Sequence, residues 1–489
     1  MTKNLSGALV RGAMWSVALR WGVRLMGLLS TLVIARLLTP ADYGLIAMAS
    51  LVMGLIETFL DADASTALLR SPNADPDFVN SAWTARLLQS LLVATVIGIA
   101  APFASIYFEE PRLSAVLWAF CFITVGSGVG SLGPLLARRD LDFFLEVKVA
   151  LFARIVGFFA TVGLALLLRT YWALVFGAVV GMLAGLIASY TVHPFRPRLT
   201  LSHFREIFGF SQWMLVSGIG LFFARKLDGF VVGRVGTAGD LGIYNLALEL
   251  GQMITMELGA PLNRALLPVL ANLHEDRSRM QAVMMKTVAA VNTVTLPAGI
   301  GLALVAPLAV PALLGPQWTA AIPLLAIFSV IGAIRFMTGP YYTLLMTLGH
   351  SRLLAFMSWT ELAAFAAAIA VFYTDGVTGI AEARVCSTLL IGLVWIVIGA
   401  RFGLQPLALG RAVLRPVIGT GLMALALWAL PPLALPTLLE LAYRIVAGAA
   451  VYCAWIGLSW IAAGRPDGLE QIAVEQLDAI RRRTVQAFR

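Results

Sequence analysis

Long apolar segments recur along the whole of this 489-residue chain. Many of them reach about 20 residues or more, the length at which a helix crosses the hydrocarbon core of a bilayer. The chain is 60% hydrophobic and only 12% charged, and its mean hydropathy is +0.88. A soluble chain carries about twice that share of charged residues. The sequence therefore predicts an all-α polytopic membrane protein.

Breaks at proline, glycine and charged residues divide the apolar segments into about fourteen expected transmembrane helices. The first segment is too long for the apolar part of a signal peptide and lacks a cleavage site of small residues, so we expect a retained first helix. The expected helices of the first half span 13–38, 42–66, 79–107, 113–137, 147–169 and 171–192. Those of the second half span 207–234, 240–268, 284–313, 319–348, 353–374 and 377–400, followed by 415–431 and 437–462.

A short motif occurs twice, with the second copy 198 residues after the first. Arg36, Thr39, Asp42 and Gly44 return in the same register as Arg234, Thr237, Asp240 and Gly242. Each copy closes one apolar segment and opens the next, so the chain consists of two related halves. In membrane proteins such halves usually enclose a central path that opens to each side in turn. We interpret the repeated threonines, aspartates and glycines as turn and cap residues at a hinge.

The spacing of the repeat predicts the domain organisation. An even number of expected helices separates the two copies, so the halves are parallel repeats about an axis along the membrane normal. We expect an N-terminal six-helix bundle at 1–195 and a second one at 205–402 around a central cavity. Two accessory helices at 411–462 and a cytoplasmic tail at 465–489 follow. The tail has apolar residues at helical spacing, which favours an amphipathic helix on the membrane surface, although a solvated tail fits equally well.

Basic residues predict the orientation. With the N-terminus in the cytoplasm, most of the 35 Lys and Arg residues fall on the cytoplasmic side. This asymmetry predicts that both termini are cytoplasmic. The net charge of +9 is better explained by this rule and by anionic lipid headgroups than by nucleic acid. On the other side the sequence places five basic residues: Arg36, Arg112, Arg169, Arg234 and Arg384.

Ionisable residues within the first two expected helices fall on single helical stripes. Arg20 and Arg24 share one stripe, and Glu57 and Asp61 share another. An ionisable group inside the bilayer is costly and usually faces a partner or a wet cavity. Two arginines suit an anionic substrate such as a lipid diphosphate, although Arg20 could simply reach the headgroups. The two acids balance these arginines, which we prefer to the weak match of Asp61-Ala-Asp63 to a glycosyltransferase motif.

The second half carries further charges within its expected helices. Arg225 and Lys226 are candidate substrate-binding residues, and Asp228, three positions after Arg225, can pair with it. Glu249 is a candidate carrier of a proton or cation, or a partner for Arg225. We expect Arg335 and Glu361 to form a structural ion pair. Glycine patterns at 126–130 and 181–185 predict close helix packing.

Several functional classes lack their sequence signals. The three cysteines lie inside apolar segments without metal-ligand spacing, and the four histidines lie in or beside short loops. No nucleotide-binding loop motif is present, which argues against direct use of ATP. The short extracytoplasmic loops leave no room for a soluble catalytic domain. We therefore expect no metal, no cofactor, no nucleic acid and no enzymatic activity.

With these residues in view, the chain resembles the polysaccharide transporter family. These are the oligosaccharide flippases of the multidrug/oligosaccharidyl-lipid/polysaccharide exporter superfamily. The resemblance rests on the first copy of the repeat from Ile34 to Gly44, on the second from Gly239 to Asn245, and on the stretch from Pro261 to Pro268. It covers roughly residues 5–460, and its motifs are structural turns rather than catalytic signatures.

This resemblance implies two six-helix bundles and movement of an undecaprenyl-diphosphate-linked oligosaccharide from the inner to the outer leaflet. It implies a role in exopolysaccharide, O-antigen or capsule biosynthesis at the bacterial inner membrane. The partners would be this lipid-linked substrate, anionic lipids, and polymerase and export machinery. We expect a monomer. Two alternatives stay open at this point: a cation-coupled drug or small-molecule exporter of the same superfamily, and a membrane polymerase or ligase of lipid-linked glycans.

Overall fold

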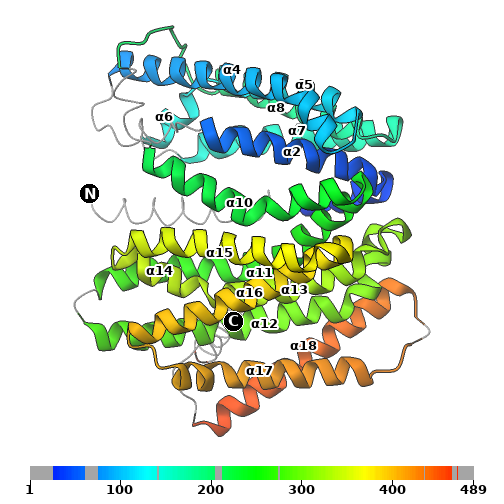
Figure 1. Cartoon of the computed structure of the whole chain (residues 1–489), viewed down its shortest axis with the longest axis vertical. Helices are drawn as coiled ribbons and strands as arrows, with labels where there is room; N and C mark the ends of the chain where they lie inside the picture. The colour runs from blue at the N-terminus through cyan, green and yellow to red at the C-terminus, as the bar shows by residue number, and fades with distance from the viewer. Residues whose placement is uncertain are drawn as a thin grey trace, which may run out of the picture. The chain divides into compact units, whose positions relative to one another are not determined.

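The computed structural model describes residues 22, 26–60, 75–139, 143–203, 212–273, 276–433, 435–464 and 471. Every regular element in these ranges is a helix, which confirms the all-α prediction (Figure 1). Within these described ranges, ten segments are long and apolar enough to cross a membrane. The expected number of fourteen transmembrane helices stays a prediction. The chain divides into two compact units, Met1–Ile243 and Tyr244–Arg489, and each is described by itself below. The predicted division at 195–205 and the separate accessory and tail segments stay predictions.

The first unit is a bundle of long helices around short connections. Its membrane-length helices pack as antiparallel neighbours, with α4 against α5 and α7 against α8. The helices are α2 (Pro40–Leu60), α4 (Pro76–Tyr107), α5 (Arg112–Val129), α6 (Gly133–Arg139), α7 (Phe143–Leu168), α8 (Trp172–Thr191), α10 (Gln212–Val235) and the start of α11 (Ala238–Asn272).

The predicted glycine packing joins α7 to α8. The backbone of Gly157 approaches that of Gly181, and a Cβ added to Gly185 would contact Ala153 of the facing helix. Small residues let two helix backbones come this close, which gives dispersion contacts that do not depend on water. In the 126–130 pattern, Gly126 contacts Met182 of α8. The expectation of close packing at both glycine patterns is therefore confirmed.

The expected helix 113–137 is broken in the structure. It divides into α5 and α6 at Gly130, whose backbone is extended. Three side chains from neighbouring helices bond to the carbonyl groups at this break. The Trp83 indole donates to the oxygens of Val129 and Gly130, Tyr190 Oη donates to Val129 at 2.7 Å, and Arg86 donates to Ser127 at 2.7 Å. Backbone polar groups without access to water need hydrogen-bond partners within the protein. These three side chains provide such partners and stabilise the break.

The connection after α8 is held against the start of α4. The Asn80 side-chain oxygen accepts from the Arg198 amide at 3.0 Å, and Thr84 Oγ1 accepts from the Thr200 amide at 3.1 Å. Ser81, fully buried, bonds Ser202. These buried polar residues at the start of a membrane helix are explained by the extended segment that they bind.

The second unit contains the rest of α11 and the helices that follow it. α12 packs against α13, α17 and α18, and α15 packs against α16 (Figure 1). The expected helix 319–348 is broken here at Thr338, just before Pro340. The elements are α12 (Arg277–Ala309), η1 (Val310–Leu314), η2 (Pro316–Trp318), α13 (Ala321–Met337), α14 (Gly339–Thr347), α15 (Ser351–Phe372), η3 (Tyr373–Asp375), α16 (Gly376–Arg401), α17 (Pro406–Ala429) and α18 (Thr437–Ala462).

Two contacts organise this second unit. α11 packs on α13 through Gly251, Thr255 and Gly259, whose faces meet side chains or backbone of α13 at four-residue intervals. α18 is tied to α12 by a bond from Tyr452 Oη to the carbonyl of Thr293 at 2.6 Å. Pro297 lies four residues after Thr293 and has no amide hydrogen to offer that carbonyl. Tyr452 therefore replaces the hydrogen bond that the proline removes.

Candidate functional site

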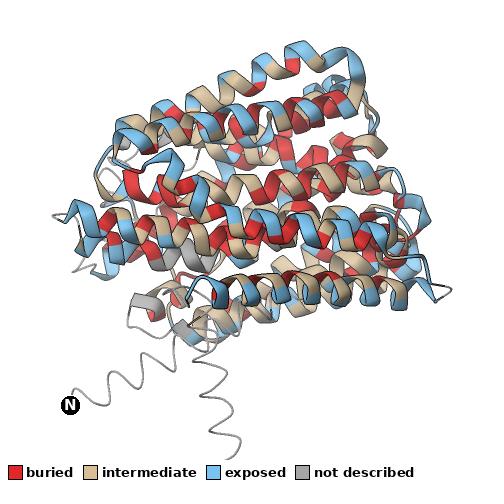
Figure 2. Ribbon diagram, turned by 90° about the horizontal axis from the view of Figure 1, so that it is seen from below, coloured by how far each residue is buried: buried red, intermediate tan, exposed pale blue. Residues whose placement is uncertain are grey.

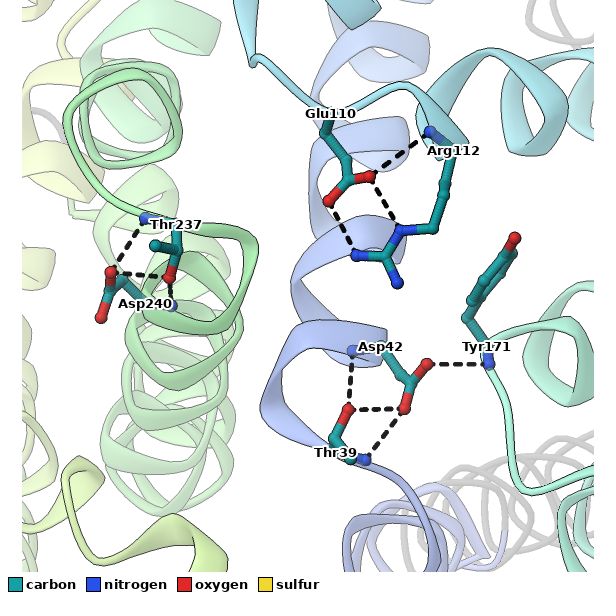
Figure 3. A network of polar contacts seen from close by, with 7 residues as sticks. All are labelled: Thr39, Asp42, Glu110, Arg112, Tyr171, Thr237 and Asp240. Atoms are coloured by element: carbon teal, nitrogen blue, oxygen red, sulfur yellow. Dashed lines mark hydrogen bonds and ion pairs between the residues drawn. The ribbon is translucent and has the colours of Figure 1, made fainter.

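The first copy of the repeat forms a helix cap at the start of α2. Asp42 Oδ2 accepts from the amide and the hydroxyl of Thr39, at 3.0 and 2.6 Å, and Thr39 Oγ1 accepts from the Asp42 amide at 3.3 Å (Figure 3). This reciprocal arrangement satisfies amides that the first helical turn leaves without partners. The other Asp42 oxygen accepts from the amide of Tyr171, just before α8, at 3.0 Å. We call residues 39–44 the first turn.

The second copy forms the same cap at the start of α11. Asp240 Oδ2 accepts from the amide and hydroxyl of Thr237, both at 2.8 Å, and Thr237 Oγ1 accepts from the Asp240 amide at 3.2 Å (Figure 3). We call residues 237–242 the second turn. The expectation that the repeated Thr and Asp are cap residues is therefore confirmed for both copies.

The repeated glycines have a different role from the one expected. Gly44 and Gly242 lie inside the first helical turns of α2 and α11, and there the two copies touch each other. A Cβ on Gly44 would overlap the carbonyl oxygen of Ala238, and one on Gly242 would overlap that of Pro40. The prediction that these glycines are turn residues is wrong, because they permit a backbone contact between helices. We call this contact the turn pair.

Below the turn pair, α2 and α10 run antiparallel and pack against each other (Figure 1). Gly229 of α10 lies against Leu51, and Gly54 of α2 lies against Phe222. These contacts set the register, so that the charged residues of α10 lie near the level of residues 50–53 of α2. Glu57 of α2 and Arg225 of α10, both predicted site residues, therefore lie on neighbouring helices of the same unit.

α2 carries two exposed polar residues on one face, while Phe59 near its end is exposed as well. Ser50 and Glu57 are exposed, whereas most residues from Asp42 to Val52 are buried. Figure 2 colours the helices by burial, with buried residues red and exposed residues pale blue. α4 shows the reverse, because most of its exposed residues are apolar and suit contact with lipid. A polar exposed face on a helix of this length usually lines a water-filled cavity. The exposed apolar residues of α4 include Leu88, Leu91, Leu92, Ile99, Phe103 and Ile106.

α10 carries two adjacent exposed cations and one buried acid. Arg225 and Lys226 are both exposed, and Asp228 is 1% exposed. Asp228 Oδ1 accepts from the Gly229 amide at 2.9 Å. These charges explain why α10 does not count among the ten strongly apolar segments. The arrangement presents positive charge outward along a membrane-length helix, while the pairing of Arg225 with Asp228 stays a prediction.

In the second unit, α11 has an exposed face and a packed face. Glu249 and Met256 are exposed, while Gly251, Thr255 and Gly259 pack against α13. Glu249 is thus placed on the accessible face of its helix. An exposed carboxylate within a long membrane helix can bind a proton or a cation or face one in a partner.

Arg335 and Glu361 form the expected ion pair. Arg335 Nη2 of α13 lies 2.9 Å from Glu361 Oε1 of α15, and both side chains are about one-third exposed or less. The pair holds two helices of the second unit together, so its structural interpretation is confirmed. Three other predicted site residues, Arg20, Arg24 and Asp61, lie outside the described residues.

A separate group of charged residues lies near the first and second turns. Glu110 binds Arg112 through two bonds of 2.8 Å, and this guanidinium holds the pKa of the Glu110 carboxyl below its usual range (Figure 3). Arg112 also lies over the ring of Tyr171. Glu109 pairs with the repeated Arg234 at the end of α10. Sequence reasoning missed both pairs, and for Glu109 and Arg234 the reason is that the partners lie in different connections.

Metal chemistry has no support in the part of the chain that the structure describes. Within it, no three His, Cys, Asp or Glu side chains gather in a group able to hold an ion. Four of the predicted site residues are exposed charges on helices: Glu57, Arg225 and Lys226 in the first unit and, by itself, Glu249 in the second.

Comparison with known proteins gives the same fold in solved transporters. The chain matches the lipid II flippase MurJ in an inward closed conformation with a TM-score of 0.71 at 12% identity, over 93% of this chain and 100% of that one. It matches an inward-facing multidrug resistance transporter of the MATE family with a TM-score of 0.57 at 15% identity, over 80% and 96% of the two chains. At these identities the likeness concerns the fold.

Two of the relatives at the sequence level are named for the biosynthesis of succinoglycan and of lipopolysaccharide. The succinoglycan biosynthesis transport protein ExoT of Rhizobium meliloti is 24% identical over 432 residues, which cover 87% of each chain. The lipopolysaccharide biosynthesis protein WzxC of Escherichia coli is 23% identical over 345 residues, 69% of each chain. An uncharacterized membrane protein from the cps region of Klebsiella pneumoniae is 22% identical over 342 residues, 69% of this chain and 70% of its own.

A family model decides the assignment. The model described as polysaccharide biosynthesis protein matches residues 33–323, which is more than half of the chain. The matched stretch includes both copies of the repeat and all of the described charges on α2, α10 and the first part of α11. This multi-pass membrane protein therefore belongs to the polysaccharide biosynthesis protein family.

Proposed function

We propose that this protein is a flippase that moves an undecaprenyl-diphosphate-linked oligosaccharide from the cytoplasmic to the periplasmic leaflet for exopolysaccharide, O-antigen or capsule biosynthesis. The observation that carries the proposal is the family match, extended by the match to a named transport protein over 87% of both chains. The lipid tail stays in the bilayer while the charged headgroup and sugars cross through the protein.

Exposed cations supply the chemistry that such a headgroup needs. A diphosphate cannot cross hydrocarbon unless its charge is offset, and Arg or Lys side chains do this through charge-assisted hydrogen bonds. Arg225 and Lys226 are exposed on α10, next to the polar face of α2. We assign substrate binding to these two residues together with Arg20 and Arg24.

Acidic residues take the complementary roles. Glu57 and Asp61 balance the cationic charge when no substrate is bound, and Asp228 and Glu249 couple movement to a proton or cation or pair with the nearby arginines. Movement consists of rocking of the bundles 1–195 and 205–402 about the substrate, with both termini in the cytoplasm. The protein acts as a monomer without enzymatic activity or cofactor, beside anionic lipids and the polymerase and export machinery.

One competing function is export of drugs or other small molecules coupled to a cation. Its support is the MATE-like fold and the accessible carboxylate of Glu249. The adjacent cations Arg225 and Lys226 disfavour the cationic drugs that such exporters carry, because like charges repel each other in a poorly screened site.

Complementation of a deletion strain separates the two functions. We expect wild-type protein to restore polymer export without changing drug susceptibility. Arg225→Gln and Lys226→Gln together should lower export about tenfold or more, since each lost charge-assisted bond contributes about 1.5–3 kcal/mol. Arg411→Gln, which removes an exposed cation from α17, is the matched control and should export normally. Full export by the double variant would remove these residues from the site, and restored drug resistance without polymer would favour the exporter.

A further inference from the structure

The connection after α8 has an exposed face that combines charged and apolar side chains. Arg196 and Arg198 are exposed, and Leu199 and Leu201 are 75% and 55% exposed. We call residues 195–203 the strap. We propose that the strap is a membrane-binding surface, in which the two leucines enter the boundary layer of the bilayer and the two arginines bind anionic phospholipid headgroups. This interaction goes beyond the proposed function, because it does not depend on which substrate the protein moves.

The strap is bound to α4 through its backbone. The Asn80 side-chain oxygen accepts from the Arg198 amide at 3.0 Å, and Thr84 Oγ1 accepts from the Thr200 amide at 3.1 Å. In an extended backbone, amides two residues apart point the same way and side chains two residues apart share a face. The two leucines therefore lie on one face of the strap, and the bonds to α4 leave both side chains accessible.

Contacts on both sides of the leucines fix the strap. Phe195 packs against the buried cluster around Trp83, and the Arg196 guanidinium donates to the Phe195 carbonyl at 3.0 Å. Ser202 Oγ lies 3.1 Å from Ser81 Oγ of α4. All of these partners belong to the first unit, so the placement of the strap on α4 is a property of that unit alone.

The level of the strap in the membrane follows from α4. The exposed large apolar residues of this helix begin at Leu88 and end at Tyr107. This stretch is about 29 Å long, close to the thickness of the hydrocarbon core. Thr84 and Asn80, which bind the strap, lie about 6 and 12 Å before it along the helix. The headgroup layer occupies about 5–8 Å on each side of the core, so the strap lies in and just beyond this layer.

Anionic phospholipids have the chemistry that fits both components of this face. Leucine side chains at this level can enter the boundary between headgroups and acyl chains, as the apolar residues of interfacial segments do. Arginines beside them can bind phosphate oxygens through charge-assisted hydrogen bonds. Each cation near an anionic membrane surface also adds to the electrostatic attraction. The strap is therefore complementary to the membrane surface in both charge and polarity.

The first experiment measures whether the leucine face meets lipid or water. In the full chain with Cys121, Cys386 and Cys453 replaced by serine, an environment-sensitive fluorophore is attached at Leu199→Cys or, as an exposed control at the start of α12, at Ser278→Cys. The protein is reconstituted into liposomes of phosphatidylcholine and phosphatidylglycerol in equal parts. Acrylamide, an uncharged aqueous quencher, should quench the fluorophore at position 199 several-fold less than the one at 278. Lipids with a spin label below the headgroup should quench the fluorophore at 199 more strongly. Equal acrylamide quenching at both positions would overturn the proposal and leave the strap to water or to a protein partner.

The second experiment tests the arginines through the charge of the lipid. Compared with phosphatidylcholine alone, the mixture with phosphatidylglycerol should lower acrylamide quenching at position 199 further. Arg198→Gln should remove most of this dependence on phosphatidylglycerol. Arg169→Gln, which removes an exposed cation beside the other end of α8, is the matched control and should keep it. Size-exclusion profiles verify that each variant is folded. A dependence that is absent from the starting protein, or unchanged in Arg198→Gln, would overturn the binding of anionic headgroups.

Discussion

The two turns of the repeat share one local structure and differ in how they connect to the rest of the molecule. In both, an Asp carboxylate caps a helix through the Thr three residues before it. Asp42 also accepts the Tyr171 amide, 129 residues away, and is 8% exposed. The hydrogen bonds described for Asp240 all lie within its own turn. The repeated motif thus specifies a helix cap, while the tertiary anchor of the first turn depends on a residue outside the motif.

Removal of the aspartates should show this difference most strongly. We expect Asp42→Ala to lower the free energy of unfolding by about 2–4 kcal/mol, because it removes the cap and leaves the Tyr171 amide without its partner. Asp240→Ala removes only a cap and should cost about 1–2 kcal/mol. Thermal or denaturant unfolding in detergent micelles measures both. Equal losses would show that the Tyr171 bond contributes nothing.

The Tyr171 bond can be tested from its other side. Tyr171 has a φ of −55°, which proline can adopt, so Tyr171→Pro removes the amide hydrogen at a compatible φ. Relative to Tyr171→Ala, which keeps the amide, we expect a further loss of about 1–2 kcal/mol. In the Asp42→Ala background this further loss should disappear. An undiminished difference in that background would place its cause outside this hydrogen bond.

The threonines test what the two turns share. Thr39→Val and Thr237→Val keep the shape of the side chain and remove the hydroxyl that donates to the Asp and accepts from its amide. We expect each to cost about 1 kcal/mol, with equal values within the error of the unfolding measurement. A clear inequality would mean that the two caps are not energetically equivalent.

Loss of the Glu110–Arg112 pair in acid should lower the stability of the protein only slightly. The pKa of Glu110 is lowered in the folded protein, so its contribution is present above its unfolded pKa of about 4.3 and is lost as the pH falls through the folded pKa. Because Arg112 is nearly half exposed, the pair is worth at most about 1 kcal/mol. Glu110→Gln should reduce stability at pH 7 and leave it unchanged at low pH. Melting temperatures of both proteins between these pH values measure the effect, and a constant difference would contradict it.

Sequence patterns predicted the helical architecture, the two caps and the Arg335–Glu361 pair, because each depends on local spacing or on the cost of a charge in a membrane. They did not predict the break at Gly130. That break depends on Trp83, Arg86 and Tyr190, which bond to its carbonyl groups from other helices. Periodicity within one helix carries no information about such partners.

The same reason limits prediction of the site. The sequence shows charged residues inside the expected helices that became α10 and α11. Only the packing of each helix shows that Arg225, Lys226 and Glu249 are exposed while Asp228 is buried. The role of Gly44 and Gly242 was missed because glycine after a turn usually indicates backbone freedom. Here its small size matters, since the two copies of the motif contact each other.

Leaflet inversion tests the central claim most directly. Purified protein is reconstituted into liposomes with a fluorescent undecaprenyl-diphosphate oligosaccharide, and the fraction open to an impermeant quencher is followed with and without a proton or sodium gradient. The account predicts lipid movement well above that of protein-free liposomes, lost in the Arg225→Gln, Lys226→Gln double variant and kept in Arg411→Gln. Movement no faster than in protein-free liposomes under every gradient, by protein that is folded and inserted, would contradict it.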